Sequence, residues 1–286
     1  MTTPAAAAFV LTLSCPDRAG IVHAVTGVLV ERGANITEAQ QFNDAATGLF
    51  FMRVAFDAPG ATLESLNAAF APLAERLALR ATLAPATGRM RTLILVSQLG
   101  HCLNDLLFRW RTGLLALDIR GVVSNHRDFE SLVTGYGLPF YHVPVDASTK
   151  PAAEARLLEL IEAGRIELVV LARYMQILSD ALCRRLAGRA INIHHSFLPS
   201  FKGAQPYRQA FDRGVKIIGA TAHYVTVDLD EGPIIEQDIA RVDHSHDPAE
   251  LTAIGRDVEC AVLARAVRWH AERRVLIDRN KTVVFR

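Results

Sequence analysis

Two segments in the second half of the chain carry the side chains best suited to chemistry. The first, NIHHSFLPSFKGAQPY, occupies residues 192–207 and begins at the end of an apolar run typical of a buried strand. Asn192 and His194 alternate and therefore share one face of that strand. An amide N–H and an imidazole can together stabilise an oxyanion, and a histidine can transfer protons. A lone histidine at a strand end is more often structural, so a second group is needed.

The second segment, GATAHYVTVDLDEGPIIEQD, occupies residues 219–238. It places Asp228 and Asp230 in a loop between two expected strands. An aspartate in such a loop is usually a turn former. Its separation from the first segment makes it a candidate partner for His194.

Together the two segments resemble the folate-binding formyltransferase family, whose members carry Asn-x-His at a strand end and an aspartate in a later loop before a glycine. The resemblance covers residues 91–270. It implies that Asn192 and His194 stabilise the oxyanion, while Asp230 orients His194 and handles protons from water. His195 is expected to support this set.

The resemblance also indicates where a folate is held. The loop after the expected strand 167–172 resembles the family's pterin-side loop, and with residues 226–230 it is expected to line the pterin pocket. For the apolar members, core packing is an equal alternative. The resemblance implies no metal and no cofactor; the folate, 10-formyltetrahydrofolate, is the substrate. The candidate substrate-binding residues are Arg173, Tyr174, Met175, Gln176, Ile177, Leu178, Thr226, Val227 and Asp228.

The formyl acceptor is indicated by the segment SQLGHCLNDLL at residues 97–107. Transformylases that act on a ribonucleotide amine carry a glycine-rich phosphate loop here, because backbone N–H groups must approach the phosphate closely. This segment has one glycine, and His101 and Asp105 do not suit a dianion. An i, i+4 pair between those two residues is equally open.

HCLNDLL is instead similar to the formyltetrahydrofolate deformylases, in which the acceptor is water. The resemblance implies hydrolysis to formate and tetrahydrofolate, with formate supplied to one-carbon and purine metabolism. Formyl transfer to an amine is the alternative. A formyltransferase acting on methionyl-tRNA is not favoured, because it would need a basic surface and a carboxyl-terminal domain, whereas the extra domain expected here precedes the catalytic one.

Alternating strand and helix patterns after residue 90 predict a Rossmann-like, mainly parallel sheet flanked by helices. Ligands bind beyond the carboxyl ends of strands in such sheets. Asp247-Pro248-Ala249-Glu250 predicts a capped start for a long final helix. The expected strands are 92–97, 119–123, 139–145, 167–172, 190–193, 216–226 and 233–240.

The first 86 residues predict the order βαββαβ, which is a ferredoxin-like fold. The segment CPDRAGIVHAVTGVLVERGANI resembles ACT domains. The resemblance implies a small amino-acid effector at a subunit interface, with Asp17, Gly20, Asn35 and Ile36 as candidate contacts. Assembly without an effector is an equal alternative. The predicted domains are therefore an ACT-like domain at 1–86 and a formyltransferase-type domain at 90–286.

Composition excludes several other classes of protein. Lys plus Arg (31) balance Asp plus Glu (30), so nucleic acid is not an expected partner. No apolar run approaches the roughly 20 residues of a membrane span. The four cysteines lack CxxC spacing, and the histidines lack HExxH spacing. We expect a cytoplasmic homo-oligomer, dimeric or tetrameric. A catalytically idle sensor would have lost part of the catalytic set, whereas all three residues are present.

Overall fold

The chain folds into two compact units, each of which is described by itself. The structure is a computed structural model that describes residues 7–198 and 206–286. One unit contains the residues up to Gly88 together with Glu272–Asp278 and Val283–Arg286, and the other contains Arg89–Ala271 and Arg279–Thr282. The carboxyl-terminal segments thus group largely with the first unit, whereas the sequence pattern assigned them to the second. The predicted limits 1–86 and 90–286 of the functional domains stay a prediction.

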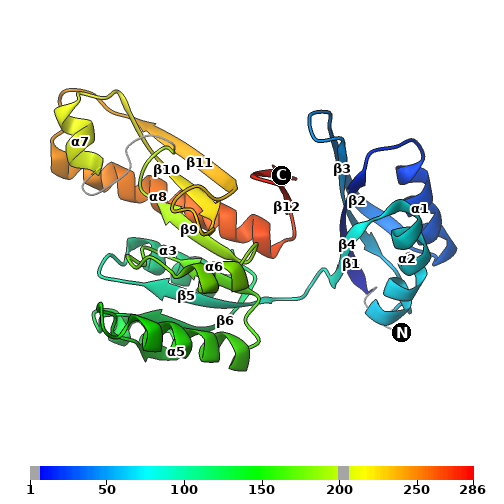
Figure 1. Ribbon diagram of the computed structural model, residues 1–286, viewed down its shortest axis with the longest axis horizontal. Coiled ribbons are helices and arrows are strands. Elements are labelled where there is room, and N and C mark those ends of the chain that lie inside the picture. Colours follow the sequence, from blue (N-terminus) through cyan, green and yellow to red (C-terminus); the bar gives the residue numbers. More distant parts are fainter. Residues whose placement is uncertain (1–6, 199–205) are drawn as a thin grey trace. The chain divides into compact units, whose positions relative to one another are not determined.

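The first unit has the predicted ferredoxin-like order (Figure 1). Its strands form a sheet in the order β2-β3-β1-β4. Both helices present apolar residues at helical spacing to one core, including Val25 and Leu29 of the first and Phe70 of the second. The elements are β1 (Ala8–Pro16), α1 (Ile21–Glu31), β2 (Asn35–Asp44), β3 (Leu49–Asp57), α2 (Leu63–Leu77) and β4 (Arg80–Pro85).

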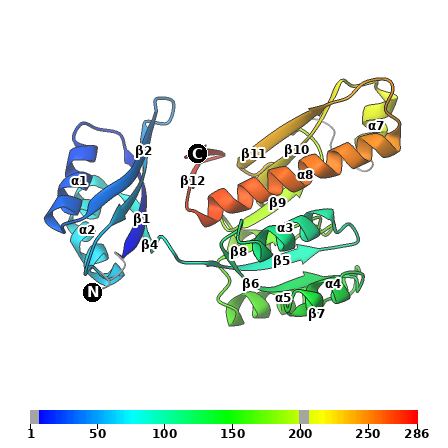
Figure 2. The same cartoon turned by 180° about the vertical axis from the view of Figure 1, so that it is seen from behind.

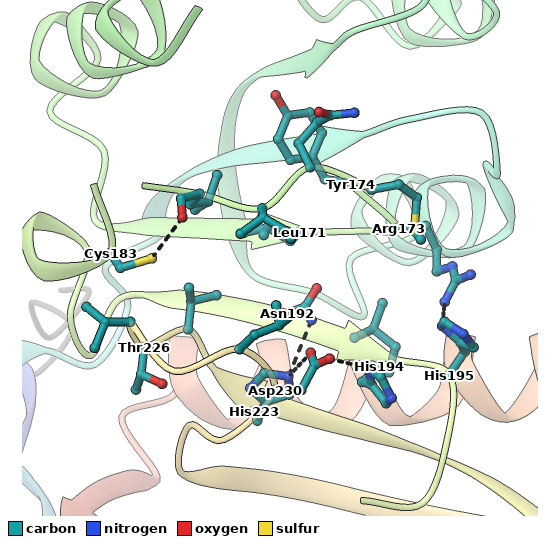
Figure 3. Close-up of a pocket in the computed structure, with 18 residues that line it drawn as sticks. Leu171, Arg173, Tyr174, Cys183, Asn192, His194, His195, His223, Thr226 and Asp230 are labelled. Carbon is teal, nitrogen blue, oxygen red and sulfur yellow. Dashed lines mark hydrogen bonds and ion pairs between the residues drawn. The ribbon is translucent and has the colours of Figure 1, made fainter. Parts of the chain in front are cut away.

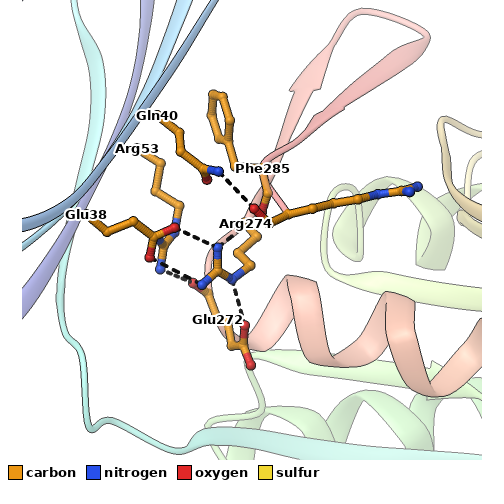
Figure 4. Close-up of polar contacts among 7 residues, drawn as sticks. Glu38, Gln40, Arg53, Glu272, Arg274 and Phe285 are labelled. Atoms are coloured by element: carbon orange, nitrogen blue, oxygen red, sulfur yellow. Dashed lines mark hydrogen bonds and ion pairs between the residues drawn. The ribbon is translucent and has the colours of Figure 1, made fainter.

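A polar network joins the sheet of this unit to the end of the chain (Figure 4). Arg274 contacts Glu38 at 2.9 Å and Glu272 at 2.7 Å. Arg53, which is buried, contacts the same Glu38 at 3.0 Å. The short strands β12 (Val275–Asp278) and β13 (Lys281–Val284) follow and pair with each other. Sequence patterning missed this hairpin, because both strands are only four residues long.

The second unit is the predicted α/β fold with a sheet in the order β11-β10-β9-β8-β5-β6-β7. The five strands from β9 to β7 are parallel, while β10 and β11 are antiparallel. The elements are β5 (Met90–Val96), α3 (His101–Arg111), β6 (Leu117–Ser124), α4 (Glu130–Gly135), β7 (Phe140–His142), α5 (Lys150–Ala163), β8 (Leu168–Leu171), α6 (Asp180–Arg185), β9 (Ala190–His194), α7 (Pro206–Asp212), β10 (Ile217–Tyr224), β11 (Ile234–Arg241) and α8 (Pro248–Ala271).

Helices cover both faces of this sheet (Figure 2). The long helix α8 packs on β9, β10 and β11 and also against α3. On another side, Leu157 and Ile161 of α5 join a core with Leu93 and Val169 of the central strands. The sheet is therefore held between layers, and the carboxyl ends of its parallel strands are left to shape a site.

Local sequence signals give most of these boundaries. The predicted capping box of α8 is confirmed, because Asp247 Oδ1 accepts from the backbone N–H groups of Ala249 and Glu250 at 2.7 and 2.8 Å. The strand expected at 139–145 is wrong in length, since only Phe140–His142 pairs with β6. Within the described part of the chain, none of the helices combines the length and apolarity needed to cross a membrane.

Candidate active site

The predicted catalytic residues meet beside the end of β9 (Figure 3). Strand β9 ends at His194, and β10 runs antiparallel beside it with His223 opposite Asn192. After β10 the chain turns back through Asp230 and Gly232. A Cβ on Gly232 would lie 1.7 Å from the Tyr224 carbonyl oxygen, so only glycine allows this turn. The turn carries the carboxylate of Asp230 back to the strand end.

Asp230 and His194 form a charge-assisted pair. The Nδ1 of His194 lies 3.2 Å from Oδ2 of Asp230, and both side chains are largely buried. The hydrogen bond from His194 is the largest influence on Asp230: it holds the pKa of this carboxyl well below its usual range and outweighs the opposing effect of burial. The carboxylate is therefore ionised, and Nδ1 of His194 carries the proton between them. Among the described residues, the buried Nε2 of His194 has no hydrogen-bond partner.

His223 is a site residue that the sequence patterns did not assign to the catalytic set. Its Nε2 lies 3.3 Å from Nδ2 of Asn192 and 3.6 Å from Oδ1 of Asp230. Its Nδ1 donates to the Tyr224 carbonyl at 2.9 Å, because a carbonyl oxygen only accepts. With its proton on Nδ1, the neutral ring of His223 accepts at Nε2 from the amide of Asn192 and so holds that amide beside Asp230. Its position in β10 is the feature that could have revealed it, because pairing of β9 with β10 places His223 directly opposite Asn192.

These side chains line a cavity of about 260 Å³. Every predicted substrate-binding residue lines it except Asp228, whose carbonyl accepts a hydrogen bond from Thr226 at 3.0 Å. Apolar side chains at its rim stay exposed, with Met175 at 57% and Ile177 at 62%. Exposed apolar groups around polar ones are typical of a ligand site. The lining residues are Leu171, Arg173–Leu178, Cys183, Asn192–His195, His223, Val225–Val227, Leu229 and Asp230.

One expectation for a neighbouring residue changes, and the place of another becomes clear. His101 does not pair with Asp105: its Nε2 contacts Glu259 at 2.8 Å, and Asp105 pairs with Arg109 at 2.7 Å. The local i, i+4 pairing is therefore wrong, because α8 brings a buried carboxylate to the first turn of α3. His195 follows the last residue of β9 and lines the same cavity as His194. Residues 199–205 of the same segment lie outside the described residues.

The candidate effector residues of the first unit fall into two places. Asp17 accepts a hydrogen bond from Asn43 at 2.9 Å, and Gly20 follows it with a left-handed φ of 90°. Asn43 lies near the end of β2, whereas Asn35 and Ile36 begin that strand. At 3.3 Å per residue the two ends of the strand are about 25 Å apart. One chain therefore does not bring the four residues together. Their effector role stays a prediction that requires a second copy.

The fold and the site together define an α/β enzyme of the formyl-transfer type with an additional small domain. The family model for formyl transferase matches residues 90–267, and the model for the ACT domain matches residues 9–71. A formyltetrahydrofolate deformylase from Corynebacterium sp. (strain P-1) is 53% identical over 97% of this chain and 98% of its own length. The corresponding protein of Bacillus subtilis (strain 168) is 49% identical over 96% of this chain and 93% of its own length.

The similar solved structures include a formyltetrahydrofolate deformylase and, at lower similarity, a transformylase. The crystal structure of a formyltetrahydrofolate deformylase from Burkholderia mallei has a TM-score of 0.95 at 54% identity, covering 98% of this chain and all of that one. A glycinamide ribonucleotide transformylase from Symbiobacterium toebii has a TM-score of 0.64 at 30% identity, covering 69% of this chain and 95% of its own. The chain belongs to the formyltetrahydrofolate deformylase family.

Proposed function

We propose that the protein hydrolyses 10-formyltetrahydrofolate to formate and tetrahydrofolate, with Asn192, His194 and Asp230 at the reacting atoms. One observation carries the proposal. An ionised Asp230 fixes Nδ1 of His194, while the buried Nε2 of that histidine lacks a partner among the described residues and the ring lines the cavity. An imidazole anchored at Nδ1 by a carboxylate, with Nε2 available to gain or lose a proton, is the arrangement that acid-base catalysis needs.

The reaction balances with water as the only co-substrate. The water oxygen bonds to the formyl carbon, and the carbonyl oxygen becomes an oxyanion stabilised by Asn192 and a protonated His194. Asp230 accepts a proton from the water. Collapse then breaks the bond between the formyl carbon and N10: N10 takes the proton that Asp230 accepted, and the hydroxyl proton passes to solvent as formate leaves. The formate released can supply one-carbon and purine metabolism.

The cavity supports binding of the pterin end of the folate. Its volume, about 260 Å³, suits a fused ring system rather than the whole substrate, since pockets for drug-sized ligands begin at about 300 Å³. The exposed side chains of Met175 and Ile177 offer apolar surface to the part that extends outward. We expect the reaction to need no metal or organic cofactor, because protons and hydrogen bonds suffice for each step.

The first domain supports a regulatory or assembly role. Its match to the ACT domain favours a small effector, and we propose an amino acid bound between copies by Asp17 and Gly20 of one and Asn35 and Ile36 of another. Binding between copies requires assembly, and we propose a dimer or tetramer. We propose neither nucleic acid nor a membrane as a partner. A cytoplasmic location is likewise proposed.

Formate release tests the proposed activity. Purified protein is incubated with 10-formyltetrahydrofolate, without an amine and with a chelator, and formate is measured against time. Steady production supports metal-free hydrolysis. Formyl transfer that begins only when an amine is added would instead make the protein a transformylase, and production that stops with the chelator would require a metal.

A further inference from the structure

A buried polar cluster lies next to the catalytic residues and has no part in the reaction described above. Glu259 of α8 is at its centre, with a side chain that is 1% exposed. Its Oε2 contacts Nε2 of His101 at 2.8 Å and Nε of Arg173 at 3.4 Å. Its Oε1 accepts from the hydroxyl of Tyr207 at 2.6 Å. Three separate segments therefore converge on one carboxylate.

The packing around this carboxylate is specific. Gly255 lies one helical turn before Glu259 on α8, and a Cβ there would come within 2.2 Å of the Tyr207 ring. A glycine inside a helix costs about 1 kcal/mol relative to alanine. Here it makes room for the ring that carries the hydroxyl to Glu259. Two residues of α8, spaced i and i+4, thus build one socket.

The carboxylate is ionised in this socket. Burial alone would raise the pKa of Glu259, but hydrogen bonds from His101 and Tyr207 and the charge of Arg173 lower it overall. His101, Cys102 and Glu259 hold ligand-type atoms within 4.8 Å of one another. The guanidinium of Arg173 at the same carboxylate disfavours a cation there. The charge of Glu259 is therefore directed at Arg173 and His101.

Arg173 carries the effect of Glu259 to the active site. Its guanidinium is buried, its φ of 65° is left-handed, and its NH1 donates to Nδ1 of His195. His195 must therefore accept at Nδ1. Burial, followed by the charges of Arg173 and His194, lowers the pKa of His195 to about 4, so this ring is neutral near pH 7 with its proton on Nε2.

The neutral ring of His195 lies against the catalytic histidine. The ring centroids of His194 and His195 are 5.1 Å apart with an interplanar angle of 20°, which is a stacked geometry. Asp230 fixes His194 at one nitrogen, whereas the stack fixes the plane of its ring. The titratable and charged groups around His194 are Asp230 and His223 on one side and His195, Arg173 and Glu259 on the other.

We infer that Glu259 is a positioning residue for deformylation: through Arg173 it holds His195, and His195 holds the ring of His194. This role rests on the proposed function. Without the negative charge, the buried guanidinium of Arg173 is uncompensated and moves toward water, so His195 loses its donor. The remaining positive charge also disfavours protonation of the histidine pair.

The test is Glu259→Gln in the complete chain, which keeps the shape of the side chain and removes its charge. We expect kcat to fall by about tenfold or more while KM changes by less than about threefold. The alkaline limb of the kcat profile is expected to move to lower pH by about 0.5 to 1 unit. Glu236→Gln is the matched control, because Glu236 is also buried and pairs with Arg265 of α8 at 2.9 Å. It should leave both readouts unchanged.

A double-mutant cycle separates positioning from a purely structural role. If Glu259 acts through His195, then Glu259→Gln combined with His195→Leu loses little more kcat than the worse single variant. Losses that multiply would overturn the inference, as would an unchanged kcat and pH profile in Glu259→Gln. Should that variant fail to fold, as judged by circular dichroism, Tyr207→Phe replaces it in the cycle. Absence of formate release by the unaltered protein would instead count against the proposed function.

Discussion

The sharpest prediction concerns Asp230→Asn. An asparagine fits the same space: its Oδ1 can accept from Nδ1 of His194, and its Nδ2 can face His223 where Oδ1 of Asp230 now lies, 3.6 Å away. The variant therefore removes the charge and the proton acceptor without leaving a cavity. We expect it to fold and to bind folate normally.

The expected loss can be worked out from the contact itself. His194 and Asp230 are 3.2 Å apart at the nearest atoms. Unit charges about 4 Å apart attract by roughly 4 kcal/mol at an effective dielectric constant of about 20. Because about 1.4 kcal/mol corresponds to tenfold in rate, losing this stabilisation of a protonated His194 lowers kcat by up to about 10³-fold. Loss of a positioned base alone gives about 10² to 10⁴.

The assay is formate release at saturating 10-formyltetrahydrofolate, with tetrahydrofolate binding followed by calorimetry. Glu231→Gln is the matched control, since it removes a carboxylate from the same loop outside the set of cavity-lining residues. A kcat for Asp230→Asn within about threefold of the unaltered protein, with binding intact, would refute the assigned role. Loss of binding together with turnover would show that Asp230 holds the substrate rather than the proton.

Three further predictions concern packing, charge and the pocket rim. Gly255→Ala should lower the melting temperature through its clash with Tyr207, whereas Gly27→Ala in α1, with open space, should raise stability by about 0.5 to 1 kcal/mol. Arg274→Gln should destabilise the protein in urea unfolding at pH 7, because the hydrogen bond from Arg274 lowers the pKa of Glu38. That stabilisation is fully present above pH 4.5 and is lost as pH falls through the lowered pKa, so the effect of the substitution should shrink with falling pH below 4.5. Met175→Ser should raise KM about tenfold with kcat retained, which steady-state kinetics would show.

Much of the architecture follows from local sequence. Apolar periods of two and 3.6 residues set the strands and helices, and the capping box at Asp247 set the start of α8. The order βαββαβ was sufficient to predict the ferredoxin-like fold of the first unit. The proposed catalytic set could be grouped from the sequence because Asn192 and His194 lie on one strand and Asp230 lies in the loop after the strand that pairs with it.

Other features depended on contacts between distant segments. The role of His223 required the register between β9 and β10, and the cluster at Glu259 required α8 to cross the first turn of α3. Local spacing instead suggested a pair between His101 and Asp105. The strand expected at 139–145 failed for a related reason, because pairing with β6 is available only to Phe140–His142.

The sequence by itself determined the two folds, the family and the three residues proposed to act on the formyl group. Each of these is encoded in short-range patterns or in segments whose residue types are specific. The tertiary structure decided which buried charges meet, as with Arg173, His195 and Glu259. The energy of a buried charge depends on its partners and its distance from water, and a linear pattern contains neither quantity.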